Sequence, residues 1–156
     1  MTWCYDWPRP AVTADVCALS RDPAGRWHVL LVSRANEPFR GMWALPGGFL
    51  DVDREDLETC ARRELKEETG ITAPAELPLL DVRSRPDRDP RGHTVTAVHL
   101  ARFGWPPPEP RADDDAADAR WIPVDEAAPL AFDHADILKT ALERIGRKDA
   151  EPKAPP

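Results

Sequence analysis

Three glutamates, Glu64, Glu67 and Glu68, stand at positions i, i+3 and i+4 of one short segment. On a helix this spacing stacks the three side chains on one face, with Cβ atoms about 5–6 Å apart. Carboxylate oxygens are the ligands that hard cations such as Mg²⁺ prefer, and Mg²⁺ is the usual companion of phosphate chemistry. The pattern therefore predicts a divalent-cation site for phosphate chemistry. The simpler alternative is a solvated acidic helix face.

The residues around the glutamates favour the cation site. Residues 43–46 indicate an extended apolar segment, and the pair Gly47-Gly48 predicts a flexible turn whose backbone can approach a ligand closely. Asp53 is expected to cap the helix that follows, and Gly70 to end it. The acidic residues are thus expected on a short helix that directly follows a loop suited to close contact.

These residues resemble the signature of the Nudix hydrolase family, G-x5-E-x7-R-E-U-x-E-E-x-G-U, where U is a bulky apolar residue. Residues 55–71 match the second part of that signature at every fixed position. The first part differs, because six residues instead of five separate Gly48 from Glu55. One extra loop residue leaves the acidic helix face unchanged.

The resemblance implies roles for the signature residues. Glu64, Glu67 and Glu68 are expected to be metal ligands or water-activating bases, and the backbone carbonyl of Gly47 to join them as a ligand. Arg63 is expected to orient the glutamates, so that Arg63, Glu64 and Glu67 form the catalytic group. The implied cofactor is Mg²⁺, with Mn²⁺ as a substitute.

Other candidate residues surround this group. Glu55 is expected to contact the metal cluster from behind and fix its geometry. Gly48 and Arg34 are candidate substrate-binding residues; for Arg34, a phosphate contact and a plain strand-end arginine are equally good readings. An extra ligand or base is also expected in an acidic run that contains Asp114, Asp115 and Asp118. The simpler alternative for this run is a solvated loop.

Segments outside the signature suggest a subgroup and a substrate. Residues 8–15, 85–92 and 130–134 are similar to segments of bacterial ADP-ribose pyrophosphatase-like Nudix proteins. The resemblance implies a pyrophosphohydrolase that cleaves ADP-ribose to AMP and ribose 5-phosphate. One alternative is a hydrolase of oxidised nucleoside triphosphates such as 8-oxo-dGTP. The second is a non-enzymatic ADP-ribose sensor, as in regulators of the same subgroup that carry an additional DNA-binding domain.

Length and charge restrict the partners. A chain of 156 residues suits a single domain, and its net charge of −7 argues against a nucleic-acid partner. The sequence shows neither a signal-peptide pattern nor an apolar run that could span a membrane, and its three cysteines lack metal-ligand spacing. We expect a cytoplasmic enzyme with a small nucleoside diphosphate substrate, no nucleic-acid or membrane partner, and no room for a further domain after residue 146.

The expected domain covers residues 1–146 and alternates strands with helices, which predicts the α/β or α+β class. The resemblance sharpens this to an α/β/α sandwich with a mixed β-sheet. Asp133 is expected to cap a last helix that ends near Ile145, before a disordered Pro-rich tail at 147–156. Residues 1–9 form an N-terminal arm whose aromatic residues could stack on an adenine, form a homodimer contact or pack on their own subunit. The expected strands lie at 11–19, 27–33, 77–83, 94–103 and 120–124.

Overall fold

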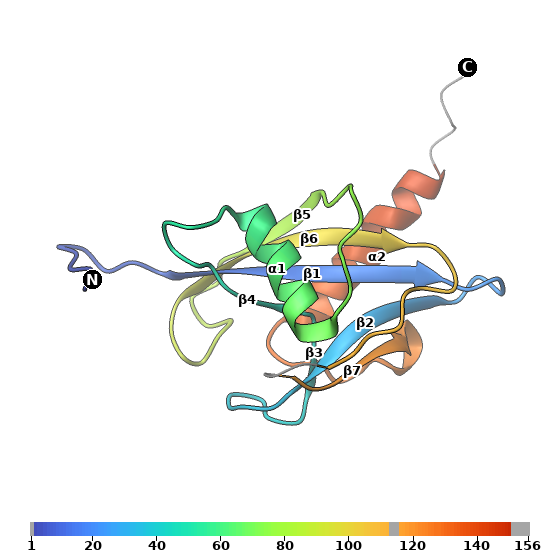
Figure 1. Cartoon of the computed structure of the whole chain (residues 1–156), viewed down its shortest axis with the longest axis horizontal. Helices are drawn as coiled ribbons and strands as arrows, with labels where there is room; N and C mark the ends of the chain where they lie inside the picture. The colour runs from blue at the N-terminus through green and yellow to red at the C-terminus, as the bar shows by residue number, and fades with distance from the viewer. Residues whose placement is uncertain (1, 113–115, 151–156) are drawn as a thin grey trace, which may run out of the picture.

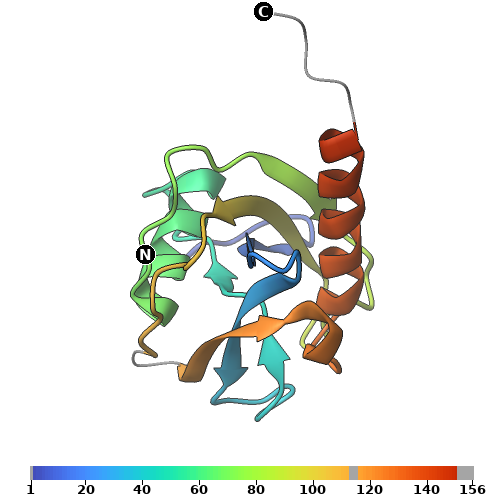
Figure 2. The ribbon, with the colours of Figure 1, turned by 90° about the vertical axis from the view of Figure 1, so that its right-hand side faces the viewer.

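One mixed β-sheet separates two helices in the computed structural model, which describes residues 2–112 and 116–150 (Figures 1 and 2). The strand order is β3-β2-β1-β6-β5, with β4 also paired to β1 and β7 to β2. Strands β1 and β6 run parallel, whereas the other pairs are antiparallel. The elements are β1 (Ala11–Arg21), β2 (Trp27–Arg34), β3 (Trp43–Ala44), β4 (Gly47–Phe49), α1 (Leu57–Thr69), β5 (Leu79–Arg83), β6 (Thr94–Phe103), β7 (Ala116–Pro123), the 3₁₀ turn η1 (Val124–Glu126) and α2 (His134–Ala150).

The central strand β1 is buried on both faces, and its side chains alternate between two cores. Val16 and Ala18 pack with Leu65 of α1 on one face, while Cys17 and Leu19 lie in the cluster that contains the apolar face of α2 on the other. The two helices therefore cover opposite faces of the sheet, as Figure 2 shows. This arrangement confirms the α/β/α sandwich expected from the sequence.

Strand β1 changes its antiparallel partner along its length, and this change opens the sheet. Residues 19–21 pair with β2, whereas residues 13–15 pair with β4. The segment expected to be a Gly-Gly turn is thus a short strand. It pairs with β1 because glycine has no Cβ to collide with that strand: at Gly47, a Cβ would overlap the carboxylate of Asp15.

Helix α1 ends where the sequence predicts but begins with a different cap. Gly70 adopts the left-handed conformation, with φ of 71°, and its N–H bonds to the carbonyl of Lys66. The N-cap is Asp56 and not Asp53, because the Asp56 carboxylate accepts from the N–H of Thr59 at 2.8 Å. Asp53, with φ of 66°, lies in the preceding loop, which contains the extra residue relative to the signature.

The C-terminal half of the chain differs from expectation at two helix ends. Asp133 does stand directly before α2, as expected, and its carbonyl accepts from the N–H of Ile137 at 3.2 Å. Its carboxylate, however, does not cap the helix, because both oxygens accept from Arg88, at 2.7 and 3.0 Å. Helix α2 passes the expected end at Ile145 and reaches Ala150, so residues 147–150 of the expected tail are helical. The rest of that tail, 151–156, lies outside the described residues. Strand β7 is also longer than expected, since it begins at Ala116.

The N-terminal arm extends away from the sheet (Figure 1). Its aromatic side chains are largely exposed, at 54% for Trp3, 47% for Tyr5 and 80% for Trp7. Burial of these residues against their own subunit is therefore wrong, whereas an adenine or dimer contact stays a prediction. Within the described parts of the chain, neither helix is both long and apolar enough to cross a membrane.

Candidate functional site

A cavity of about 430 Å³ lies where β1 exchanges β2 for β4. Its walls come from β1, the end of β2, β4, α1, the β5–β6 loop and the start of α2. Segments far apart in the sequence thus meet at the opening of the sheet. The signature residues Gly47, Gly48, Glu64 and Glu68 all line this cavity.

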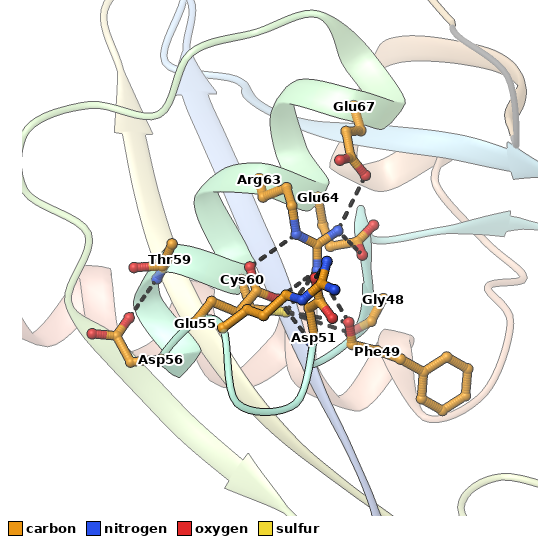
Figure 3. Close-up of polar contacts among 11 residues, drawn as sticks. Gly48, Phe49, Asp51, Glu55, Asp56, Thr59, Cys60, Arg63, Glu64 and Glu67 are labelled. Atoms are coloured by element: carbon orange, nitrogen blue, oxygen red, sulfur yellow. Dashed lines mark hydrogen bonds and ion pairs between the residues drawn. The ribbon is translucent and has the colours of Figure 1, made fainter. Parts of the chain in front are cut away.

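Arg63 is the centre of an ion-pair network behind the cavity (Figure 3). Its guanidinium donates to both carboxylate oxygens of Glu55, at 2.6 and 2.9 Å, and to the carbonyl of Phe49 at 3.1 Å. The same side chain contacts Glu64 at 2.7 Å and Glu67 at 3.1 Å. Arg63 therefore ties the signature loop to the acidic face of α1.

Glu55 completes this network despite the extra loop residue. Its side chain is only 5% exposed, and it also accepts from the N–H of Asp51 at 2.9 Å. The hydrogen bonds from Arg63, with those from the Asp51 N–H and the Cys60 side chain, lower the pKa of Glu55 to about 2. Glu55 is therefore a fixed anion that holds Arg63 in place.

Glu68 carries the most perturbed carboxyl group of the cavity. Burial raises the pKa of Glu68 to about 8; the bond from the Gly47 N–H, 3.1 Å long, acts against this shift, and the neighbouring carboxyls of Glu64 and Asp15 add to it. Burial also raises the pKa of Glu64, against the opposing effect of Arg63. Like-charged carboxyl groups thus crowd one wall of the cavity with incomplete neutralisation.

Gly48 is required by close packing against this wall. A Cβ at Gly48 would lie 2.5 Å from the carboxyl carbon of Glu64. Any larger residue would therefore displace Glu64, which explains why the signature needs glycine here.

Asp15, Thr96 and His134 form a buried polar group for which the sequence predicted no role in the site. The Thr96 hydroxyl donates to Asp15 at 2.6 Å, and Nδ1 of His134 accepts from the N–H of Leu45 at 3.0 Å. That bond places the proton of the neutral imidazole on Nε2, which lies 3.9 Å from Asp15. Burial lowers the pKa of His134, consistent with the neutral form. These three residues share no local motif. They meet only through the parallel pairing of β1 and β6 and the position of the start of α2.

The remaining wall is basic and aromatic. Arg34, at the end of β2, lines the cavity together with Arg91 and Asp89 from the β5–β6 loop, and with Phe132 before α2. Arg34 donates through Nε to the carbonyl of Pro38 at 2.7 Å. Arg91 and Asp89 fall within the 85–92 segment that resembles the ADP-ribose subgroup, but no local pattern distinguishes them from the other residues of that segment.

Among the described residues, the expected acidic run does not join this site. Asp118 lies on β7, outside the cavity lining, and its carboxylate bonds to Arg120 at 2.6 Å and to the N–H of Ala119 at 2.8 Å. Asp118 is therefore not an extra ligand in this arrangement, because its strand position directs it to neighbours on β7. Asp114 and Asp115 lie outside the described residues.

The donor types at the cavity suit a hard divalent cation, but one glutamate points elsewhere. Glu64 and Glu68 line the cavity, whereas the Glu67 side chain is 58% exposed and bonded to Arg63. Among the described residues, no three acidic, histidine or cysteine side chains are grouped closely enough to hold a metal as they stand. Glu64 and Glu68, whose oxygen donors repel one another and are only partly neutralised, are the side chains that would hold an ion.

Comparison with known proteins agrees with this geometry. The family description "NUDIX domain" matches residues 11–141. The chain is 45% identical to an ADP-ribose pyrophosphatase of Methanocaldococcus jannaschii over 112 residues, which cover 71% of this chain and 63% of that protein. It is 35% identical over 146 residues to the ADPR responsive transcriptional repressor NtrR of Acinetobacter baylyi, covering 92% of this chain and 57% of the repressor. The NUDIX domain of Shewanella oneidensis NrtR, solved in complex with ADP ribose, superposes with a TM-score of 0.82 at 32% identity, over 90% of this chain and 94% of that one.

Since the family match spans most of the sequence, this chain belongs to the Nudix family. Its likeness to a pyrophosphatase supports a Nudix hydrolase, and enzymes of that kind generally use divalent metals. The chain spans less than two thirds of the length of either curated relative. The family predicted from residues 55–71 is thus confirmed.

Proposed function

We propose that this protein is an Mg²⁺-dependent hydrolase that cleaves ADP-ribose to AMP and ribose 5-phosphate, with Mn²⁺ as a substitute cation. The observation that carries the proposal is the pair Glu64 and Glu68, half-buried on one wall of a cavity whose other wall holds Arg34 and Arg91. Such a cavity offers oxygen ligands to a cation and guanidinium groups to phosphate oxygens. The pyrophosphatase relative and the ADP-ribose complex of the Shewanella domain support the choice of substrate.

In the proposed reaction, the oxygen of water forms a bond to one phosphorus, the anhydride P–O bond breaks, and a phosphate ester leaves. A divalent cation, when bound, lowers the pKa of the attacking water and stabilises the negative charge that develops on the phosphate oxygens. The chain's own residues position the reactants. Arg63, fixed by Glu55, holds Glu64, and the Gly47 N–H holds Glu68, so both carboxylates keep their orientation before substrate binds.

A second candidate function is an ADP-ribose sensor without hydrolysis. It is favoured by the Acinetobacter relative, a transcriptional repressor aligned over 92% of this chain. Against it stands the intact acidic group, since a protein that only binds ADP-ribose does not need buried carboxylates that repel a diphosphate. That the chain binds no nucleic acid stays a prediction.

The decisive experiment measures kcat/KM for ADP-ribose and for 8-oxo-dGTP with Mg²⁺, with Mn²⁺ and with excess chelator, identifying both products. We expect AMP and ribose 5-phosphate from ADP-ribose, at a higher kcat/KM than for 8-oxo-dGTP, and no reaction in chelator. The Glu68→Gln variant should lose at least about a hundredfold in kcat, while Glu58→Gln, on an exposed part of the same helix, should retain activity.

Each result separates the candidates. A higher kcat/KM for 8-oxo-dGTP would transfer the proposal to the triphosphate hydrolases. Tight ADP-ribose binding without product would support the sensor. Full activity in chelator would show that the metal requirement is wrong.

A further inference from the structure

Two arginines face the cavity from elements other than α1, and one aromatic ring lies beneath both. The guanidinium carbon of Arg34 is 4.8 Å from the ring centroid of Phe132, and that of Arg91 is 5.7 Å from the same centroid. Arg91 also lies 5.1 Å from the ring centroid of Phe49. Phe39 packs edge-on against Phe132, at 4.9 Å between centroids, and thereby supports the ring from outside.

The two guanidinium groups repel one another. Burial lowers the pKa of Arg34, and the positive charge of Arg91 lowers it further. Within the described residues, Arg34 makes no salt bridge, and its hydrogen bond goes to the neutral carbonyl of Pro38. The carboxylates of Glu68, Asp89 and Asp15 oppose this effect, but an anion placed between half-buried Arg34 and exposed Arg91 would reduce the repulsion of the two guanidinium groups directly.

Asp89 fixes the orientation of Arg91. The Asp89 side chain is 2% exposed, and its oxygens accept from Nε of Arg91 at 3.0 Å and from Nη2 at 2.8 Å. It also accepts from the backbone N–H of Arg91 at 2.9 Å and lies 3.4 Å from the Thr94 hydroxyl. Burial alone would raise the pKa of Asp89, but the bonds from Arg91 outweigh it and lower the pKa. Nη1 of Arg91 has no partner among the described residues, so one face of a rigidly held guanidinium is available to a ligand.

Phe49 links this wall to the signature loop. It is the last residue of β4, its carbonyl accepts from Arg63, and its ring points away from the Arg63 network (Figure 3). The ring is 49% exposed and lines the same cavity. A planar group bound next to Arg91 would therefore have an aromatic face within reach.

We propose that Arg91 and Arg34 form a clamp that binds the diphosphate of the substrate from the side opposite α1, with Asp89 as the residue that positions Arg91. This inference rests on the proposed function, because it concerns an organic diphosphate in the same cavity. The clamp supplies what the acidic wall lacks: a diphosphate carries negative charge, and Glu64 and Glu68 repel it. Binding from two sides also holds the anhydride in one orientation.

The test measures binding without chemistry and without metal. The probe is the α,β-methylene analogue of ADP-ribose, titrated by calorimetry in excess chelator into the wild type and four variants: Arg91→Gln, Arg91→Lys, Asp89→Asn and Arg85→Gln. Arg85 is the matched control, since it lies in the same loop, is 80% exposed and pairs with Asp87 away from the cavity. Thermal melts of every variant establish that each is folded at the assay temperature.

The clamp predicts that Arg91→Gln raises Kd about tenfold to a hundredfold, the range expected when one charge-assisted hydrogen-bonding group is lost. Arg91→Lys should fall between Gln and the wild type, because it keeps the charge but not the planar fork. Asp89→Asn should weaken binding by a smaller factor, and Arg85→Gln should bind like the wild type. In turnover with Mg²⁺, Arg91→Gln should raise KM more than it lowers kcat, which a purely structural defect would not do.

Wild-type affinity in a folded Arg91→Gln variant would overturn the clamp, as would an equal loss in Arg85→Gln or no binding by the wild type. If Arg91→Gln does not fold, Arg91→Lys decides instead, and wild-type affinity there would count against the planar fork. Loss in Arg91→Gln with wild-type affinity in Asp89→Asn would overturn the positioning role. Arg91-dependent binding without hydrolysis of ADP-ribose would retain the clamp and remove the proposed reaction; hydrolysis with no Arg91 dependence would do the opposite.

Discussion

Replacing Glu68 with glutamine should make the metal-free protein more stable at pH 8. Burial first, and then the carboxyls of Glu64 and Asp15, raise the pKa of Glu68 from 4.5 to about 8. A carboxyl group whose pKa is higher in the folded than in the unfolded state binds its proton more tightly when folded. The contribution of protonated Glu68 to the free energy of unfolding is therefore fully present below pH 4.5. It is lost as the pH rises from 4.5 towards 8. Glutamine has the shape of the protonated acid and does not ionise.

The size of the effect follows from that shift. One pKa unit corresponds to about 1.36 kcal/mol, so ionisation of Glu68 should reduce the free energy of unfolding by about 3–4 kcal/mol between pH 5 and pH 8. This difference corresponds to a change in Tm on the order of 10 °C for a domain of this size. Glutamine can keep the bond from the Gly47 N–H, because its amide oxygen is also an acceptor.

The assay is urea unfolding in excess chelator at pH 5 and at pH 8, for the wild type, Glu68→Gln and Glu67→Gln. Glu67 is the matched control, since it is the preceding residue of the same helix and its side chain is 58% exposed. We expect Glu68→Gln to exceed the wild type mainly at pH 8, and Glu67→Gln to show no such pH-dependent gain. Added Mg²⁺ should stabilise the wild type more than Glu68→Gln, because the ion binds the folded state through that carboxylate.

Two results would refute this reasoning. Equal stability of the wild type and Glu68→Gln at pH 8 would mean that Glu68 is not strained in the folded protein. A gain of the same size at pH 5 and pH 8 would mean that the variant stabilises by packing and not by removing a charge.

Three further changes have defined outcomes. Gly48→Ala should lower kcat at least about tenfold, because the added Cβ displaces Glu64; a wild-type kcat would contradict that close approach. Arg63→Lys should reduce metal affinity or activity about tenfold to a hundredfold, measured by Mg²⁺ titration of turnover, and an unchanged titration would remove Arg63 from the positioning network. His134→Ala should cost about 1–3 kcal/mol in chemical unfolding, because the buried N–H of Leu45 loses its acceptor; unchanged stability would show that water replaces it.

The sequence predicted the elements whose signals are local. Helix α1 carries its acids, its apolar residues and its stop at Gly70 within one stretch, and its end is where expected. The cap was misplaced by three residues because Asp53 and Asp56 are both suitable caps, and only the loop conformation decides between them. The end of α2 was predicted too early. Residues 147–150 are mostly polar, but they continue a helix whose buried face, ending at Ile145, is packed on the sheet.

The site was predictable only where one segment contains it. Glu55 was expected to lie behind the metal cluster, and the structure shows it paired with Arg63, which contacts Glu64 and Glu67 of that group. Asp15, His134 and Arg91 come from three distant segments, each of which resembles the ADP-ribose subgroup, but nothing in their local sequence assigns these residues a role or places them together. They meet because the parallel pairing of β1 with β6 brings residues 11–20 beside 94–103, which places the β5–β6 loop at the cavity. Long-range pairing of this kind has no short sequence motif.

The crowding of carboxyl groups is itself an argument about function. A protein selected only for stability would gain by replacing Glu68 with a neutral residue. Burial and the two neighbouring carboxyl groups both disfavour the charged form of Glu68. The same wall keeps Glu64 and Asp15 within the range at which they repel Glu68, and Arg63 on this side is bonded to Glu64, Glu67 and Glu55. Arg34 and Arg91 stand on the other wall of the cavity. A positive ion bound between the two walls would relieve the repulsion and neutralise an incoming diphosphate. The instability that Glu68→Gln should remove is therefore the cost of keeping an acidic wall ready for that ion.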